Sequence, residues 1–161
     1  MRKVFLLGLV AASVAGLAVT AAGSAGQSRY SSTKRSKRVV ISTRKIPKLG
    51  QVLVNGKGLT LYMFVPDKHR RVTCKGTCAA VWPPIKLSKG AKPLAKGKAK
   101  ARLLGSDRNP AGGRVITYNK WPLYLYVSDS RPGQATGQGL NLNGGLWYVL
   151  SPSGKVIRKK A

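Results

Sequence analysis

The chain has 161 residues, a length typical of one modest domain. Lysine and arginine total 30 against three aspartates and no glutamate, which gives a formal charge of +27. Such an excess disfavours compaction and attracts polyanions, so the expected partner is an anionic cell-wall polymer or an anionic membrane surface, with nucleic acid less favoured and no specific small molecule predicted. The alternative is that the charge adapts an exported surface to its medium. A single histidine, His69, and the absence of glutamate argue against a zinc site.

The first 25 residues have the layout of a secretory signal peptide. Arg2 and Lys3 form a short basic start, an apolar run extends to Ala22, and small residues follow. This pattern predicts a secreted or extracytoplasmic protein. The apolar run is long for a signal peptide, so an uncleaved N-terminal membrane anchor is the alternative.

Residues 26–45 are rich in serine, lysine and arginine and are predicted to form a disordered basic linker. This arm would act as an electrostatic tether or remain a solvated leader. The folded domain is predicted to span residues 46–155, followed by a basic tail over 156–161.

The first predicted unit covers about residues 49–84. A β-prone run at 51–54 ends at the turn pair Asn55-Gly56, and a second run at 59–65 is stopped by Pro66. Together they predict a hairpin. The low-complexity stretch 86–102 that follows is predicted to be a mobile basic loop, with a short helix near 96–104 as the alternative.

The second predicted unit covers about residues 103–154. A strand at 114–118 turns at Asn119-Lys120 into a partner strand at 121–127, and a final strand is expected at 146–150 after a glycine-rich stretch. No helical period is long enough to build a helical core. The sequence predicts a mainly β, single small domain made of two related strand-turn-strand units with a disordered basic arm.

The two units share one short motif: a tyrosine, any residue, an aromatic residue, two further residues and an aspartate. Its members are Tyr62, Phe64 and Asp67 in the first unit, and Tyr124, Tyr126 and Asp129 in the second. The tyrosine and the second aromatic point to the same face of a strand. They are expected to pack in the core or, alternatively, to form an aromatic ligand surface with Trp82, Trp121 and Trp147.

The motif aspartates have two interpretations. They either accept backbone N–H bonds in the turns after their strands, or they orient a ligand or bind a cation. The surrounding positive field opposes cation binding.

Several segments together resemble a known family. They are Gly58-Leu59-Thr60-Leu61-Tyr62-Met63-Phe64, the Cys74 to Pro84 segment, Leu103-Leu104-Gly105, Thr117 to Tyr124, Gly137-Gln138-Gly139 and Trp147-Tyr148-Val149. They resemble the secreted repeat family of unknown function, which is described as predicted lipoproteins with a repeated Tyr-x-[Phe/Trp/Tyr]-x-x-Asp motif. The resemblance implies an exported, mainly β domain and supplies no settled activity. The chain departs from it by lacking the lipid-bearing cysteine of many relatives and by its high basicity.

Cys74 and Cys78 are the only cysteines. In an oxidising compartment, two cysteines this close predict a local disulfide that staples the loop between them. A redox role is the alternative, because neighbouring basic side chains would lower a thiol pKa.

No spacing of residues indicates a nucleophile with its base and orienting group. We therefore expect no enzyme, no catalytic residue, no cofactor and no metal. The favoured function is a non-enzymatic, exported protein of the cell envelope that binds anionic surface polymers through its basic surface. The alternatives are an extracytoplasmic redox-linked protein that uses Cys74 and Cys78, and extracellular binding of nucleic acid, which the export signal makes less favoured.

Overall fold

The structure is a computed structural model, and it describes residues 38–67 and 71–161. The predicted signal peptide, most of the predicted basic arm and His69 lie outside the described residues. The described part of the chain is mainly β, as the sequence predicts, with one short helix and two 3-10 turns.

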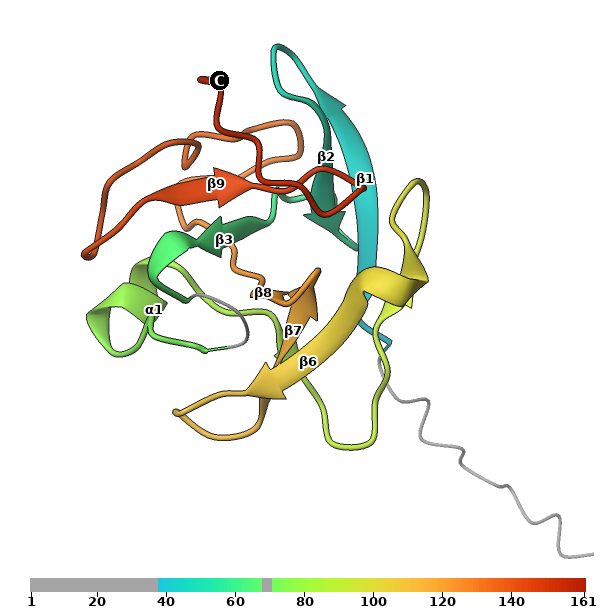
Figure 1. The fold of residues 1–161 in the computed structure, drawn as a ribbon, viewed down its shortest axis with the longest axis vertical. Coiled ribbons are helices and arrows are strands. Elements are labelled where there is room, and N and C mark those ends of the chain that lie inside the picture. The colour runs from blue at the N-terminus through green and yellow to red at the C-terminus, as the bar shows by residue number, and fades with distance from the viewer. Residues whose placement is uncertain (1–37, 68–70) are drawn as a thin grey trace, which may run out of the picture. The chain divides into compact units, whose positions relative to one another are not determined.

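Nine strands make up three small sheets (Figure 1). Their order is β2-β1-β5 in the first sheet, β3-β9 in the second and β4-β7-β6 in the third, where β8 also pairs with β7. The elements in chain order are β1 (Val40–Ile46), β2 (Gly50–Asn55), β3 (Tyr62–Phe64), η1 (Val65–Asp67), α1 (Thr77–Val81), β4 (Lys86–Leu87), β5 (Leu94–Ala95), η2 (Ala101–Leu103), β6 (Leu104–Arg108), β7 (Arg114–Tyr118), β8 (Trp121–Pro122) and β9 (Trp147–Val149).

The hairpin of β1 and β2 corrects the predicted end of the linker. Residues 40–45 were assigned to a disordered segment, yet they form most of β1, which pairs with β2 along its length from Ile41↔Asn55 to Ile46↔Gly50. The buried side chains of Ile41 and Ile46 anchor this strand in the core. Burial of apolar side chains at both ends outweighs the polar residues between them.

The predicted pairing of residues 51–54 with 59–65 is only partly correct. A bridge joins Val54 to Thr60 across the Asn55-Gly56 turn. The following strand β3 then leaves β2 and pairs antiparallel with β9, with Tyr62 opposite Val149. This long-range pairing brings the start of the first unit against the end of the second (Figure 1).

The second unit forms partly as the sequence predicts, because the partner strand expected over 121–127 is limited to β8 at Trp121–Pro122. Strand β7 turns into β8 through Asn119 and Lys120, whose φ angles of 47° and 69° give two successive left-handed residues. This is the backbone of a tight hairpin turn, a conformation that asparagine tolerates well. The final strand was predicted at 146–150 and is observed as β9.

The lysine-rich stretch 86–102 contains regular structure, where a loop or a short α-helix was expected. Strand β4 pairs with β7, and β5 pairs in parallel with β1. The 3-10 turn η2 follows where the short helix was the alternative. Three of the four residues in these strands are apolar, and Lys86 lies opposite Val115, so no two basic side chains face each other across β4 and β7.

Two clusters of buried side chains form the core. One gathers most of the aromatic residues, including Tyr62, Trp82, Tyr124 and Trp147. The other is mostly aliphatic and includes Leu61, Ile116 and Leu123. In each unit, the leucine that precedes the motif tyrosine enters the aliphatic cluster while the tyrosine enters the aromatic one. Neighbouring residues on an extended chain point to opposite faces, and this alternation explains the division.

Candidate functional site

The two motif tyrosines meet at the centre of the domain. The backbone N–H of Tyr62 donates to the carbonyl oxygen of Tyr124 at 2.9 Å, and the N–H of Tyr124 donates to the carbonyl of Tyr62 at 2.9 Å. This reciprocal pair is the pattern of an antiparallel bridge. It relates the two units by an approximate two-fold arrangement.

Each tyrosine hydroxyl then reaches the aspartate of the other unit. Tyr62 Oη donates to Asp129 Oδ2 at 2.5 Å, and Tyr124 Oη donates to Asp67 Oδ2 at 2.5 Å. The two halves of the motif therefore complete each other across the repeat. Sequence reasoning found the four residues but missed this exchange.

The remaining carboxylate oxygens are bound within their own units by a threonine. Asp67 Oδ1 accepts from the N–H of Thr73 at 2.8 Å and from its hydroxyl at 2.7 Å. Asp129 Oδ1 accepts from the same two groups of Thr136 at 3.0 and 2.6 Å. The predicted backbone N–H bonds to the aspartates are thus confirmed. A threonine six or seven residues after each motif aspartate was the sequence signal for the hydroxyl bonds.

Burial shifts the proton equilibria of Asp67 and of the two motif tyrosines. Asp67 is 0% exposed and Asp129 is 4% exposed. Desolvation raises the pKa of Asp67, and its hydrogen bonds from Tyr124 and Thr73 counteract part of that rise. The pKa of Tyr62 is raised well above its ordinary value by burial and then by its hydrogen bond to Asp129, and the pKa of Tyr124 by burial and then by the charge of Asp67. Both hydroxyls therefore keep their protons and act as donors at neutral pH.

The other aromatic residues of the motif lie in a four-ring stack beside these pairs. Phe64 stacks on Trp147 at 4.1 Å between ring centroids, Trp147 on Trp82 at 3.9 Å, and Trp82 on Tyr126 at 4.2 Å. The two tyrosines of the central bridge meet the stack edge-on, Tyr62 at Trp82 and Tyr124 at Trp147. Each motif aromatic thus stacks on the tryptophan of the other unit, which repeats the exchange of the Tyr–Asp pairs.

This placement corrects the predicted aromatic ligand surface. Trp82 and Trp147 are each 0% exposed, so they present no ring face to a ligand. Trp121 is half-buried and packs against the aliphatic cluster, apart from the other two. The interpretation of the aromatic residues as core packing is the correct one.

Close packing accounts for one glycine of the glycine-rich stretch, Gly137. A Cβ at this position would lie 2.7 Å from the Trp82 ring, closer than atoms pack. Its N–H donates to Tyr62 Oη at 3.2 Å. The glycine therefore lets the backbone approach both the stack and the Tyr62–Asp129 pair.

The predicted disulfide between Cys74 and Cys78 is present, with 5.2 Å between the Cα atoms. Cys78 lies in α1 and Cys74 follows Thr73 directly, so the bridge restrains the segment that binds Asp67. Cys74 is 3% exposed and Cys78 is 8% exposed.

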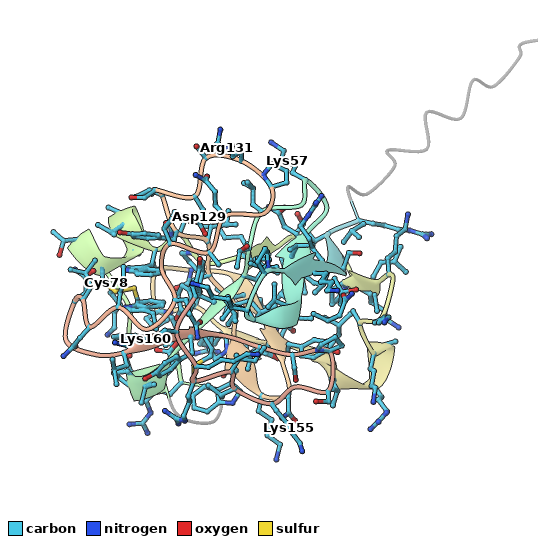
Figure 2. The ribbon with its side chains drawn as sticks, turned by 90° about the horizontal axis from the view of Figure 1, so that it is seen from above. Lys57, Cys78, Asp129, Arg131, Lys155 and Lys160 are labelled. Carbon is cyan, nitrogen blue, oxygen red and sulfur yellow. A yellow bond between two sulfur atoms is a disulfide. The ribbon has the colours of Figure 1, made fainter. Side chains whose placement is uncertain are left out.

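The charges of the described surface have one sign. Every lysine and arginine in residues 38–67 and 71–161 is exposed, whereas Asp67 and Asp129 are buried and Asp107 in β6 is half-buried. In Figure 2, Lys57 and Lys155 extend outward on opposite sides of the domain. Because all three acidic residues of the chain are described, no acidic side chain offsets this surface from an exposed position.

The described residues contain no group of three or more His, Cys, Asp and Glu side chains that could hold a metal ion. Within the same ranges, no helix is both long and apolar enough to cross a membrane.

A comparison with family models matches residues 43–86 and 106–151 to a family described as a secreted repeat of unknown function. The chain belongs to this family. The matched stretches hold Tyr62, Asp67 and Trp82 in one repeat and Tyr124, Asp129 and Trp147 in the other. The family's repeat is therefore the unit that exchanges tyrosine, aspartate and aromatic partners in this fold, and its description indicates an exported protein. Comparisons with curated proteins and with solved structures found no match.

Proposed function

We propose that this secreted-repeat protein is a non-enzymatic component of the cell envelope that binds anionic surface polymers through its basic surface. The paired repeats serve as a rigid scaffold, and the lysine and arginine side chains on it provide the attraction. The basic residues of the N-terminal arm and of the tail at 156–161 would add to the same field.

The observation that carries this proposal is that the negative side chains of the motif are buried while the positive side chains are exposed. The two motif aspartates are buried and bound by tyrosine and threonine, while every described lysine and arginine is exposed. A surface of one sign produces a potential that extends beyond single contacts and concentrates polyanions near the protein.

The redox alternative has less support. A disulfide that exchanges with thiols needs a sulfur atom that an attacking thiolate can reach. Both cysteines are almost fully buried, and their segment binds a buried carboxylate. The bridge is better suited to holding that segment than to exchanging electrons.

The proposal is tested by binding of the purified chain to isolated cell envelope over a salt series. Between 0.1 and 1 M salt the screening length falls from about 10 Å to about 3 Å, so binding is expected to weaken steeply. Acetylation of the lysines removes their charges and is expected to weaken binding at low salt, while the twelve arginines keep theirs.

Two controls make this result specific. Circular dichroism before and after acetylation must show the same fold, and envelope stripped of its anionic polymers must bind less of the unmodified chain. Binding that is as strong in 1 M salt as in 0.1 M salt, roughly the two ends of the screening range, and that acetylation does not weaken would contradict the proposal.

A further inference from the structure

One groove on the described surface has the features of a built anion site. It encloses about 530 Å³ between the β1–β2 hairpin and the segment before η2. Strand β1 contributes Ser42, Thr43 and Arg44, the end of β2 and the turn after it contribute residues 54–58, and Lys96 also lines the groove. The groove therefore combines three separate pieces of chain.

Three cations surround this groove without a counter-charge. Arg44, Lys57 and Lys96 line it, and the lining contains no acidic residue. Within the described ranges, none of the three side chains donates a hydrogen bond or forms an ion pair with another residue. Like charges around one hollow repel each other, and a bound anion relieves that repulsion while it gains charge-assisted hydrogen bonds.

One of these cations, Arg44, lies close to the backbone of a glycine turn. A Cβ at Gly58 would lie 3.2 Å from Arg44 Nη2 and 3.3 Å from the side chain of Pro132, so the guanidinium lies against the glycine turn. Gly58 has a φ of 81°, which other residues rarely adopt. The Arg44 side chain thus lies against a turn whose shape depends on a glycine.

Two residues that line the groove, Ser42 and Thr43, carry hydroxyl groups. Lys98 donates its backbone N–H to Thr43 Oγ1 at 3.1 Å. As an acceptor in this bond, the hydroxyl keeps its own hydrogen to donate, and no described residue accepts it. Ser42 Oγ lies close by, 3.3 Å from the position a Cβ would take at Gly97. The groove therefore offers neutral donors next to its cations.

We infer that this groove binds a repeat unit of a phosphodiester-linked polyol chain. The inference rests on the proposed function and gives it a specific site. Arginine presents a planar fork that matches two phosphate oxygens, and hydroxyl and amide groups suit a hydroxylated chain. The volume lies within the range of small-molecule sites, so the groove can hold a phosphate together with the polyol attached to it.

Nucleic acid shares the phosphodiester group but fits this groove less well. Proteins that bind single strands stack the bases on aromatic side chains, and no aromatic residue lines the groove. The large aromatic side chains at Trp82 and Trp147 are buried in the core. The lining thus favours a chain that has no bases.

The test measures binding of a short glycerol-phosphate oligomer to the full chain by calorimetry. The variant Arg44→Gln/Lys57→Gln/Lys96→Gln removes three charges from the groove. Lys75→Gln/Lys89→Gln/Lys120→Gln removes three charges from exposed positions elsewhere. We expect the groove variant to lose at least about tenfold in affinity, because charged hydrogen bonds are lost, and the control variant to lose about twofold or less.

A neutral variant separates shape from charge. Ser42→Gln extends a polar side chain into the groove, and it is expected to weaken binding about as strongly while the formal charge stays the same. Thermal melting of all variants checks that they remain folded.

The outcomes distinguish this inference from the proposed function. If the two charge variants lose the same affinity for the oligomer, the assignment of the site to the groove is overturned, and diffuse binding to envelope is left intact. Failure of the unmodified chain to bind either the oligomer or envelope would overturn both. Binding of inorganic phosphate or of a single-stranded oligonucleotide as tightly as the oligomer would overturn the assignment of the polyol chain.

Discussion

Each buried carboxylate of this protein has three hydrogen-bond donors, one from the other repeat and two from its own. Asp67 receives Tyr124 Oη, Thr73 N–H and Thr73 Oγ1, and Asp129 receives the equivalent groups of Tyr62 and Thr136. A buried ion is tolerated when its lone pairs are satisfied in this way. The same arrangement makes the two tyrosines hard to ionise.

This property predicts a loss of stability in alkaline solution. Folding raises the pKa of Tyr62 and of Tyr124 above the ordinary value of 10.0. Their contribution is therefore fully present below pH 10 and falls as the pH rises above it, because the unfolded chain ionises first. Each tyrosine adds a slope of up to about 1.4 kcal/mol per pH unit to the free energy of unfolding.

Urea unfolding between pH 9 and pH 11, roughly the range that brackets an ordinary tyrosine pKa, measures this slope. Tyr62→Phe or Tyr124→Phe should reduce the slope by about one tyrosine's share, since phenylalanine does not titrate. Tyr148→Phe is the matched control, because the Tyr148 ring lies under Arg158, outside the buried pairs. Equal slopes in all four proteins would show that the pairs do not govern the alkaline limit.

At the level of elements, local signals predicted the fold well and long-range pairings were missed. The Asn119-Lys120 turn and the Cys74–Cys78 bridge follow from neighbouring residues, and both are observed. The sequence predicts linker over residues 40–45 because polar residues separate Ile41 from Ile46, whereas the structure forms β1 there through pairing with β2.

The pairing of each motif tyrosine with the aspartate of the other repeat could not be predicted for a similar reason. The motif identifies Tyr62 and Asp67 as members of one copy, yet spacing within a copy does not reveal which copy a side chain contacts. The pairing of β3 with β9 and the Tyr62–Tyr124 bridge decide this, and both depend on the folded chain. The buried state of Trp82 and Trp147 was likewise decided by packing between the two units.

The bridge that joins Cys74 to Cys78 in α1 yields a prediction about stability. Replacing both cysteines by serine frees a short loop in the unfolded state and is expected to lower the free energy of unfolding by about 2 kcal/mol. Urea unfolding measures the change. Reduction of the unmodified chain should give a similar loss, and the serine variant should not respond to reductant. Unchanged stability together with loss of a thiol-exchange activity would favour the redox alternative.

At the scale of the whole molecule, both repeats contribute buried contacts to the interior and basic side chains to the surface. Exchanged Tyr–Asp pairs and the stack of four rings hold the inside together, and exposed cations cover the outside. Self-repulsion of the positive surface opposes the compact state. A scaffold in which each repeat completes the other can resist that repulsion while it keeps the cations in fixed positions.

The central claim is that the repeats lock each other through exchanged pairs, and double-mutant cycles test it most directly. One cycle combines Tyr62→Phe with Asp129→Ala across the repeats, and the other combines Tyr62→Phe with Asp67→Ala within one repeat. Urea unfolding of each single and double variant gives the coupling energy. We predict a coupling of about 1–3 kcal/mol for Tyr62 with Asp129, and under about 0.5 kcal/mol for Tyr62 with Asp67. A larger coupling within the repeat than between the repeats would contradict the account.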